Sequence, residues 1–331
     1  MIPAATLFDP VPLKAVGASL RAARFPAAPD VAARGVCVLL NGQTEFIEKY
    51  FEVIDELRER GFQVATMDWR GQGGSGRMTQ DSRKSFVGDF SEYDEDLDTL
   101  LNWIVTPMLG AGEKPVALAH SMGAHNLLRL LTRRPSSFAA GVLSAPMIGI
   151  SFRGQREFLV RAVTGYQMWR GRRAGWVWGM EARDPHRVTF ATQLVTSDPQ
   201  RFERTQMLLR EHPDLRQAGA TWSWLAAALR SMDWLKGPGR PEAITTPLLL
   251  VGAGKDRICL TPETRSFARR LPDGEYAEIR EAGHEILMER NPIRAEFWAA
   301  FDKFMTRRSV RSDLPEANAM VQGTISIDER P

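Results

Sequence analysis

A serine occupies the junction between an apolar run and an amphipathic segment, where its hydroxyl could act as a nucleophile. The segment reads Ala119-His120-Ser121-Met122-Gly123 and lies between a predicted strand at 115–121 and a predicted helix at 123–134. A sharp strand-to-helix turn of this kind lifts a serine oxygen above the sheet, and small residues on either side let strand and helix approach closely. The alternative role for Ser121 is an ordinary helix N-cap. The strand before it and the helix after it favour the nucleophile.

A nucleophilic serine needs a general base, and the chain offers five histidines. His284 lies at 281–287, directly after the last predicted strand, where its ring can reach the C-terminal edge of a sheet. Gly283 beside it suits an irregular backbone. His284 is therefore the predicted base, with a surface loop histidine as the alternative. The other four are His120, which strand alternation turns away from the serine, and His125, His186 and His212.

The predicted third member is an aspartate that follows a strongly apolar run. Asp256 lies in the glycine-flanked segment 252–258, at the end of the predicted strand 247–254. A carboxylate there can accept the imidazole N–H, fix the tautomer and stabilise the imidazolium. The alternative is a surface aspartate paired with Lys255 or Arg257. The sequence thus predicts a triad of Ser121, Asp256 and His284.

Acyl transfer also requires backbone N–H groups directed at the developing oxyanion. The N–H of Met122 is one predicted donor, because it follows the nucleophile at a helix N-terminus, where N–H groups have no helical partner. The other is expected in the loop Asn41-Gly42-Gln43-Thr44 after the first core strand. Gln43 is the predicted donor there, and Thr44 is the second candidate.

Other polar patterns point to structure more than to chemistry. The glycine-rich loop at 71–76 follows a strand, but a polar loop and not a helix comes next, which argues against a phosphate cradle. Asp68 and Arg70 are expected to organise this loop. The histidines do not cluster at metal-ligand spacing, so no metal and no cofactor are predicted.

Alternating apolar runs and helical stripes supply the elements that position these residues. Predicted strands lie at 36–42, 62–71, 115–121, 140–146, 247–254 and 275–280, and predicted helices at 46–60, 89–106, 123–134, 262–271 and 292–305. Apolar strands that alternate with helices indicate an α/β fold, with a mainly parallel central sheet covered by helices on both faces.

One segment differs in composition from the rest. Residues 151–243 contain 15 basic and 9 acidic residues, and six of the nine tryptophans of the chain. The predicted organisation is a first core part at 1–146, a helical cap insertion at 147–243, a second core part at 244–306 and a flexible C-terminal tail at 307–331.

Composition excludes several classes of protein. Hydrophobic residues make up 44% and charged residues 25% of the 331 residues, as in ordinary globular proteins. The net charge of +3 comes with no nucleic-acid-reading motif, so no nucleic-acid partner is predicted. There is no apolar run of membrane-spanning length and no secretory signal at the start. Cys37 and Cys259 fit buried free thiols, which predicts a cytoplasmic protein.

Five segments resemble the α/β-hydrolase superfamily, specifically its lysophospholipase and monoacylglycerol-lipase group, which includes serine aminopeptidases. They are NGQTEF after the first strand, DWRGQGGSGR at 68–77, AHSMGA at 119–124, GAGKDRI at 252–258 and EAGHEILME at 281–289. The triad order Ser-Asp-His is also that of α/β-hydrolases. Two departures leave the triad intact: Asn41-Gly42 stands where the group commonly has His-Gly, and Arg70-Gly71-Gln72-Gly73 replaces an RGHG-type loop. The resemblance implies an α/β-hydrolase fold and ester hydrolysis.

The predicted function is a serine esterase that cleaves a single-chain lipid ester, either a lysophospholipid or a monoacylglycerol, through an acyl-enzyme. The cap is expected to bind the acyl chain of this amphiphilic substrate, with arginines near a polar head and a contact with a membrane surface. Alternatives are a serine aminopeptidase or amidase, a small-ester esterase, and a non-catalytic amphiphile-binding protein. The predicted lining tryptophans are Trp169, Trp176, Trp178, Trp222 and Trp224.

Overall fold

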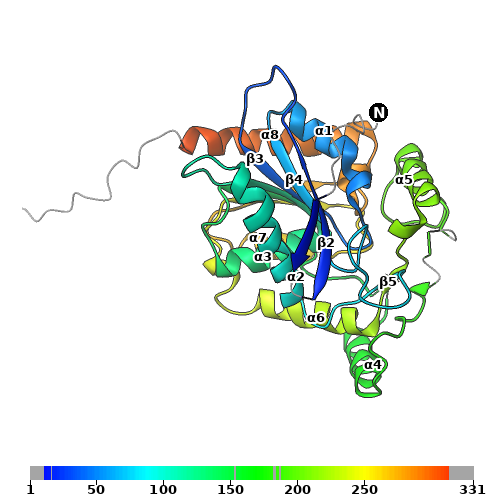
Figure 1. Ribbon diagram of the computed structural model, residues 1–331. Helices are drawn as coiled ribbons and strands as arrows, with labels where there is room; N and C mark the ends of the chain where they lie inside the picture. The colour runs from blue at the N-terminus through cyan, green and yellow to red at the C-terminus, as the bar shows by residue number, and fades with distance from the viewer. Residues whose placement is uncertain (1–10, 16, 153, 182–183, 186–187, 313–331) are drawn as a thin grey trace, which may run out of the picture.

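An eight-stranded sheet forms the centre of the molecule in the computed structural model, which describes residues 11–312 except 16, 153, 182–183 and 186–187 (Figure 1). The first strand pairs antiparallel with the second, the second pairs antiparallel with the strand at 63–68, and the remaining pairs of this sheet are parallel. In spatial order the strands are β1 (Val11–Ala15), β2 (Ala18–Phe25), β4 (Gln63–Asp68), β3 (Val36–Leu40), β6 (Val116–His120), β7 (Ala140–Ser144), β9 (Leu248–Ala253) and β10 (Gly274–Ile279).

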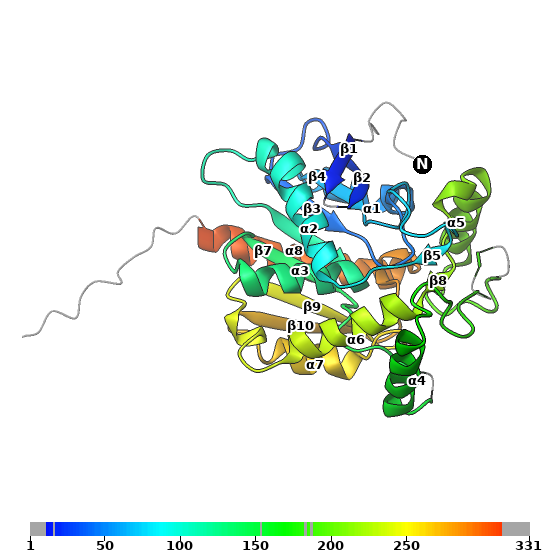
Figure 2. The same cartoon turned by 60° about the horizontal axis from the view of Figure 1, so that its bottom comes forward.

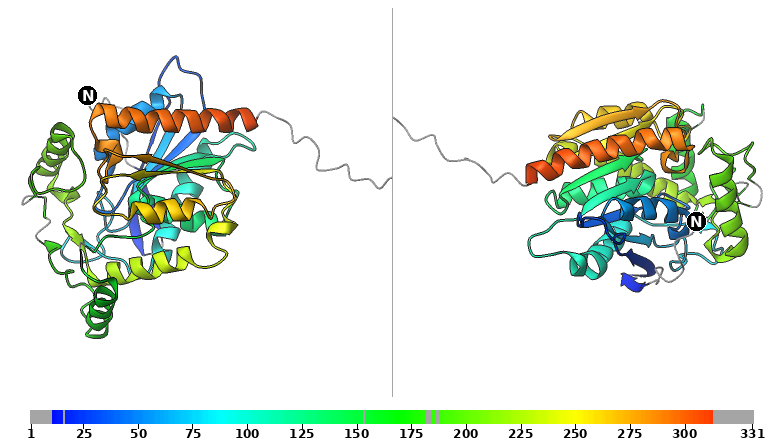
Figure 3. Two further views of the ribbon diagram at one scale, coloured as in Figure 1. Left: turned by 180° about the vertical axis from the view of Figure 1, so that it is seen from behind. Right: turned by 90° about the horizontal axis from the view of Figure 1, so that it is seen from above.

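Helices cover both faces of this sheet (Figures 2 and 3). On one face, α1 (Phe51–Glu59) and α8 (Asn291–Ser312) pack over a hydrophobic cluster of the sheet. The other face is covered by α2 (Ser91–Leu100), α3 (Ser121–Arg133), α6 (Trp222–Lys236) and α7 (Thr261–Ala268). The predicted α/β fold, with a mainly parallel sheet between two helical layers, is confirmed.

Short helical turns complete the core. The 3-10 turns lie at Ile47–Tyr50, Thr106–Met108, Pro213–Leu215, Pro241–Ala243 and Ile286–Met288, and a π-helical turn at Leu101–Val105 extends α2. Within the described residues, no helix combines the length and apolar character that crossing a membrane requires.

Each of the six predicted strands is present, but the antiparallel pair β1 and β2 was not predicted. Their sequences, VPLKA and ASLRAARF, are rich in alanine and charged residues and show no clear alternation. Buried residues such as Leu20, Ala22 and Phe25 face the two clusters only because β2 pairs with β4. Tertiary pairing, and not local pattern, makes this hairpin.

The inserted segment is mainly helical but is not all outside the core. Helices α4 (Glu157–Trp169) and α5 (Pro199–Glu211) lie beyond the end of the sheet, and β8 (Gly219–Ala220) pairs with β5 (Lys84–Ser85). In contrast, α6 lies within the range predicted as cap, 147–243, yet packs into the core layer beside α2 and α3. Its apolar face carries Trp222, Trp224, Leu225, Ala228, Leu229 and Leu235, all buried in that cluster. Helix α6 is therefore part of the helical layer over the sheet.

The predicted tail boundary also differs from the structure. Helix α8 continues to Ser312, so residues 307–312 of the predicted tail 307–331 are helical. Arg308 forms an ion pair of 2.6 Å with Asp273 and lies over the Phe304 ring, while Arg307 pairs with Glu275. These contacts to the β10 region stabilise the extra turn. Residues 313–331 lie outside the described residues.

A glycine at the start of α3 sets how closely helix and sheet approach. A Cβ atom on Gly123 would lie 2.6 Å from the carbonyl oxygen of Leu40 and closer still to that of Asn41. Both are backbone atoms at the end of β3, which cannot move aside as a flexible side chain can. Only a residue without a side chain fits at this position.

We expect Gly123→Ala to lower the free energy of unfolding by about 1–3 kcal/mol, the usual effect of overpacking. Gly165→Ala in α4 is the matched control, because a Cβ there meets no atom within 4 Å. That variant should be neutral or slightly stabilising, as alanine favours a helix. Urea unfolding of both variants measures the difference, and equal stabilities would contradict the close-packing argument.

Candidate active site

Ser121 is the first residue of α3 and directly follows β6. Its φ of +49° places it in the left-handed region, which costs a non-glycine residue of order 1–3 kcal/mol. This sharp turn is the geometry of a nucleophile elbow, in which the serine oxygen stands above the C-terminal edge of the sheet. Ser121 is 7% exposed and lines a cavity at that edge.

The three residues predicted as a triad form one hydrogen-bonded chain. The Nε2 atom of His284 lies 3.0 Å from Ser121 Oγ, and its Nδ1 atom lies 2.8 Å from Asp256 Oδ2. The N–H groups of Ile258 and Cys259 donate to the other carboxylate oxygen of Asp256 at 2.7 and 2.9 Å. A chain of this kind allows the histidine to take a proton from the serine while the carboxylate orients the ring.

The surroundings of Asp256 keep its carboxylate charged. Burial alone would raise the pKa of Asp256, but the hydrogen bond from His284 and those from the two backbone N–H groups outweigh burial and lower the pKa. An ionised Asp256 can therefore stabilise an imidazolium at His284.

Two backbone N–H groups of the loop after β3 donate to side chains. The N–H of Gly42 donates to Glu45, and the N–H of Thr44 donates to Oε1 of Gln72. The N–H of Gln43, between them, has no hydrogen-bond partner among the described residues. A Cβ atom on Gly42 would lie 3.2 Å from Ser121 Cβ, so this loop passes beside Ser121. Of the two candidates, Gln43 retains an N–H for an oxyanion, and Thr44 does not.

A buried cluster of charged side chains next to this loop was not predicted as part of the site. Lys49 Nζ lies 2.8 Å from Glu45 Oε1 and 2.7 Å from Glu285 Oε1, and the Tyr50 hydroxyl donates to Glu45 at 2.7 Å. Burial would raise the pKa of Glu45, but Lys49 together with His120 and Tyr50 lowers it to about 2. The sequence signal was available, because Glu45 and Lys49 form an i,i+4 pair within an otherwise apolar stripe.

The other described histidines do not contact Ser121 through a hydrogen bond. His120 Nδ1 lies 3.1 Å from the carbonyl oxygen of Ser144, and its ring lies 4.8 Å from that of His284. His125 Nδ1 lies 2.8 Å from the carbonyl oxygen of Met147, and its Nε2 lies 2.7 Å from Ser231 Oγ. Burial lowers the pKa of His120 to about 4 and that of His125 to about 3. His186 lies outside the described residues.

A cavity of about 660 Å³ opens at Ser121, between the sheet edge and the cap. Its apolar lining includes Met147, Ile150, Val177, Phe202, Leu225 and Met288. Its charged lining includes Lys49, Arg201, Arg257 and Glu285. Lys49 and Arg201 each have carboxylate partners, whereas Arg257 is exposed and has no ion-pair partner among the described residues.

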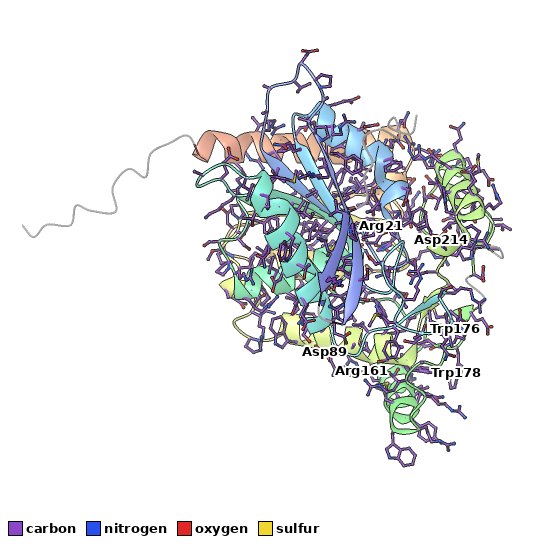
Figure 4. All side chains as sticks on the ribbon, viewed as in Figure 1. Arg21, Asp89, Arg161, Trp176, Trp178 and Asp214 are labelled. Atoms are coloured by element: carbon purple, nitrogen blue, oxygen red, sulfur yellow. The ribbon has the colours of Figure 1, made fainter. Side chains whose placement is uncertain are left out.

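The five predicted lining tryptophans take different places. Trp224 lines the cavity, and its indole N–H also donates to the Tyr93 hydroxyl at 3.2 Å. Trp222 is buried in the core and packs edge-on against Trp178. Trp169 and Trp178 are 79% and 70% exposed, and Figure 4 places Trp176 and Trp178 on the outer side of the cap near α4. The composition identified the tryptophan-rich segment, but it could not predict which rings face the cavity and which face solvent.

The cap also bonds to the loop that carries His284. The N–H of Glu285 donates to the carbonyl oxygen of Val195 at 2.8 Å. Buried Glu289 accepts the N–H of Gly283 at 2.8 Å through one oxygen and the N–H of Ser197 at 3.0 Å through the other. Residues on both sides of His284 are therefore connected to the cap segment 195–197.

Three potential ligand atoms, from Asp256, Cys259 and His284, lie within 4.8 Å of one another. Two of these residues are already bonded to each other in the chain that ends at Ser121. Burial raises the pKa of the Cys259 thiol well above its usual value, which disfavours the thiolate form that binds metals. The expectation that no metal is used remains a prediction.

The sheet, the two helical layers and the residues at the sheet edge define an α/β-hydrolase. Solved structures show the same fold. A soluble variant of monoglyceride lipase from Saccharomyces cerevisiae superposes with a TM-score of 0.73 at 16% identity, covering 92% of this chain and 97% of that chain. Monoacylglycerol lipase from Paleococcus ferrophilus gives a TM-score of 0.64 at 21% identity, covering 87% and 98%.

Within that class, the chain belongs to the family described as serine aminopeptidase, S33, which matches residues 31–291. Lysophospholipase L2 of Escherichia coli (strain K12) is 30% identical over 285 residues, which cover 83% of this chain and 81% of the relative. Monoacylglycerol lipase of Mycolicibacterium smegmatis is 28% identical over 247 residues, covering 73% and 78%. The chain is accordingly an enzyme of the carboxylic-ester hydrolase class, as the sequence motifs predicted.

The buried histidines give the stability of the fold a definite pH dependence. The pKa of His125 is about 3 in the folded protein, against 6.5 for a free histidine. Between these two pKa values the unfolded chain binds more protons at His125 than the folded chain does. The contribution of His125 to the free energy of unfolding is therefore complete above pH 6.5 and is lost as the pH falls. We expect His125→Gln to reduce the slope of unfolding free energy against pH, measured by urea unfolding. The exposed His212→Gln is the control, and an unchanged slope in His125→Gln would contradict the assignment.

Proposed function

We propose that the protein is a serine hydrolase that cleaves carboxylic esters of single-chain lipids through an acyl-enzyme. The observation that carries this proposal is the hydrogen-bonded chain from Asp256 through His284 to Ser121 at the mouth of the cavity. Ser121 attacks the ester carbonyl while His284 takes its proton, and the same proton then passes to the leaving alcohol. A water molecule, activated by His284, hydrolyses the acyl-enzyme in the second half of the reaction.

The oxyanion in this mechanism is bound by the N–H groups of Gln43 and Met122. Met122 follows the nucleophile in the first turn of α3, where backbone N–H groups have no helical partner. Gln43 is the loop residue whose N–H is left without a partner among the described residues, and it lines the same cavity. Both donors are fixed before substrate arrives, so little reorganisation is needed when charge develops on the substrate oxygen.

The shape and lining of the cavity favour a lipid ester. Aliphatic side chains and Phe202 give an acyl chain an apolar surface, which contributes about 25 cal/mol per Å² buried. The relatives named lysophospholipase and monoacylglycerol lipase act on esters of this class, as their names state. The unpaired Arg257 favours an anionic head group, and therefore the lysophospholipid of the two candidates.

Two alternative activities receive less support. An aminopeptidase needs an acidic group for the substrate amino terminus, but the acidic residue among the described lining is Glu285, which is already paired with Lys49. A small-ester esterase would not need a cavity of about 660 Å³. A non-catalytic amphiphile-binding protein would not need an ordered chain of three residues that ends at a strained serine.

A substrate panel with wild type and Ser121→Ala tests the proposed function. Wild type should show kcat/KM rising from acetyl to medium-chain esters, by up to about 0.8 kcal/mol for each added methylene, until the cavity is filled. Ser121→Ala should fold normally, lose several orders of magnitude in kcat, and resist a fluorophosphonate probe. A flat chain-length series would leave a small-ester hydrolase, and strong turnover of aminoacyl amides would support the aminopeptidase.

We further propose that the cap helix α4 contacts the membrane from which the lipid comes. Its two fully buried residues are polar, Thr164 and Gln167, whereas its exposed residues are mostly apolar, with Glu157 as the charged exception. The exposed apolar side chains are Phe158, Leu159, Tyr166 and Trp169, at 51% to 79% exposure. Figure 1 shows α4 standing out from the body of the molecule. A helix that exposes its apolar side in this way is typical of an interfacial surface.

Charge and position agree with this surface. Exposed arginines flank the C-terminal end of α4, namely Arg170, Arg172 and Arg173, and they can attract anionic head groups. Trp178, also exposed, lies between Val177 and Gly179, two residues that line the cavity. A lipid drawn from the bilayer at this surface therefore has a short path to Ser121.

Vesicle binding by the inactive Ser121→Ala protein tests the surface without hydrolysis. Adding Phe158→Ala and Trp169→Ala should weaken partitioning onto anionic phosphatidylglycerol vesicles by about tenfold or more, because buried aromatic area is lost. Trp103→Ala is the matched control, since Trp103 is 70% exposed but lies on the π-helical turn after α2. Binding should also decrease as salt rises. Equal losses in both variants would contradict a specific surface on α4.

A further inference from the structure

The loop after β4 contains a glutamine that touches both sides of the oxyanion hole. Gln72 is 1% exposed and lies in the glycine-rich loop at 71–76. Its Oε1 atom accepts the backbone N–H of Thr44, and its Nε2 atom lies 3.9 Å from Met122 Sδ. One side chain thus connects the residue next to Gln43 with the residue that follows the nucleophile.

The backbone at Thr44 needs such a partner. Its φ of +63° lies in the left-handed region, which is a genuine outlier for a β-branched residue. The Thr44 hydroxyl donates to the carbonyl oxygen of Gln43 at 2.6 Å, so the peptide between these two residues is fixed from both sides. If Thr44 relaxed towards ordinary dihedral angles, the peptide between Gln43 and Thr44 would rotate. The neighbouring peptide between Gly42 and Gln43, which carries the N–H of Gln43, would move with it.

Gln72 is itself held in place by the turn around it. Its backbone N–H donates to the carbonyl oxygen of Trp69 at 3.0 Å, and its own carbonyl accepts the N–H of Ser75 at 2.9 Å. The Trp69 indole N–H donates to the carbonyl oxygen of Asn41 at 3.0 Å, at the start of the same oxyanion loop. The loop after β4 is therefore a rigid support for the loop after β3.

We infer that Gln72 is a positioning residue for the oxyanion hole. It takes up the N–H of Thr44, fixes the left-handed backbone there, and so leaves the N–H of Gln43 directed at the cavity beside Ser121. The inference rests on the proposed function, because the hole acts only in acyl transfer. Interactions of this kind matter in the transition state, so the effect falls on kcat more than on KM.

The test is the kinetics of Gln72→Met, which keeps the length of the side chain but removes the acceptor for the Thr44 N–H. With a p-nitrophenyl ester, kcat should fall about 10- to 100-fold while KM stays within about threefold, since a small misplacement of a donor costs this much. The affinity of an alkylboronic acid, which forms a tetrahedral adduct with Ser121, should fall by the same factor. Gln63→Met is the matched control, because Gln63 begins β4 at the far end of the same segment.

An unchanged kcat in Gln72→Met, or a rise in KM alone, would overturn the inference. If this variant does not fold, Gln72→Asn, whose amide is one methylene too short to reach Thr44, should give the same loss of kcat. Hydrogen exchange of wild type gives a check without substitution: the Thr44 amide should exchange slowly, and fast exchange would overturn the inference. Absence of ester turnover in wild type would instead refute the proposed function, and the exchange result would still stand by itself.

Discussion

The strained turn at Ser121 is the constraint on which the rest of the site depends. Its left-handed backbone is held because α3 packs directly against the end of β3, and Gly123 is the residue that permits this approach. The same packing brings Gly42 beside Ser121, so the loop after β3 is placed by the turn itself. Because parallel strands end at one edge of a sheet, the loops that carry Asp256 and His284 converge there as well.

Buried carboxylates that accept backbone N–H groups shape the loops around this turn. Glu45 accepts the N–H of Gly42, Asp256 accepts those of Ile258 and Cys259, and Glu289 accepts those of Gly283 and Ser197. Asp68, expected to organise its loop, accepts the N–H groups of Ile47 and Gly74. A charged acceptor forms stronger hydrogen bonds than a neutral one, so irregular backbone is stabilised where regular ladders end. The acidic residues of the site thus serve geometry as much as chemistry.

The sequence predicted those parts of the molecule whose signals are local. Strand β9 and helix α3 each have an apolar pattern of their own, and the Ser-x-Gly junction and the Gly-His-Glu segment are short motifs with a known geometry. The hairpin of β1 and β2 forms only through pairing with β4, and the side of the cap that each tryptophan faces depends on packing between distant segments. The sequence shows Gln72 as a departure from the family pattern. Its contact with Thr44 joins positions 28 residues apart, however, and the local sequence around neither residue predicts it.

The hydrogen bonds between the cap and the loop that carries His284 limit how segments of this enzyme can be exchanged by protein engineering. The carbonyl oxygen of Val195 and the side chain of Ser197 belong to the cap, yet they fix the backbone on both sides of His284. A foreign cap grafted between the strands would remove these contacts together with the apolar residues that this segment contributes to the cavity lining. The cap segment and the loop that carries His284 are therefore structurally coupled. Replacing either segment with the corresponding segment of a relative therefore requires that 195–198 and 283–289 be transferred together.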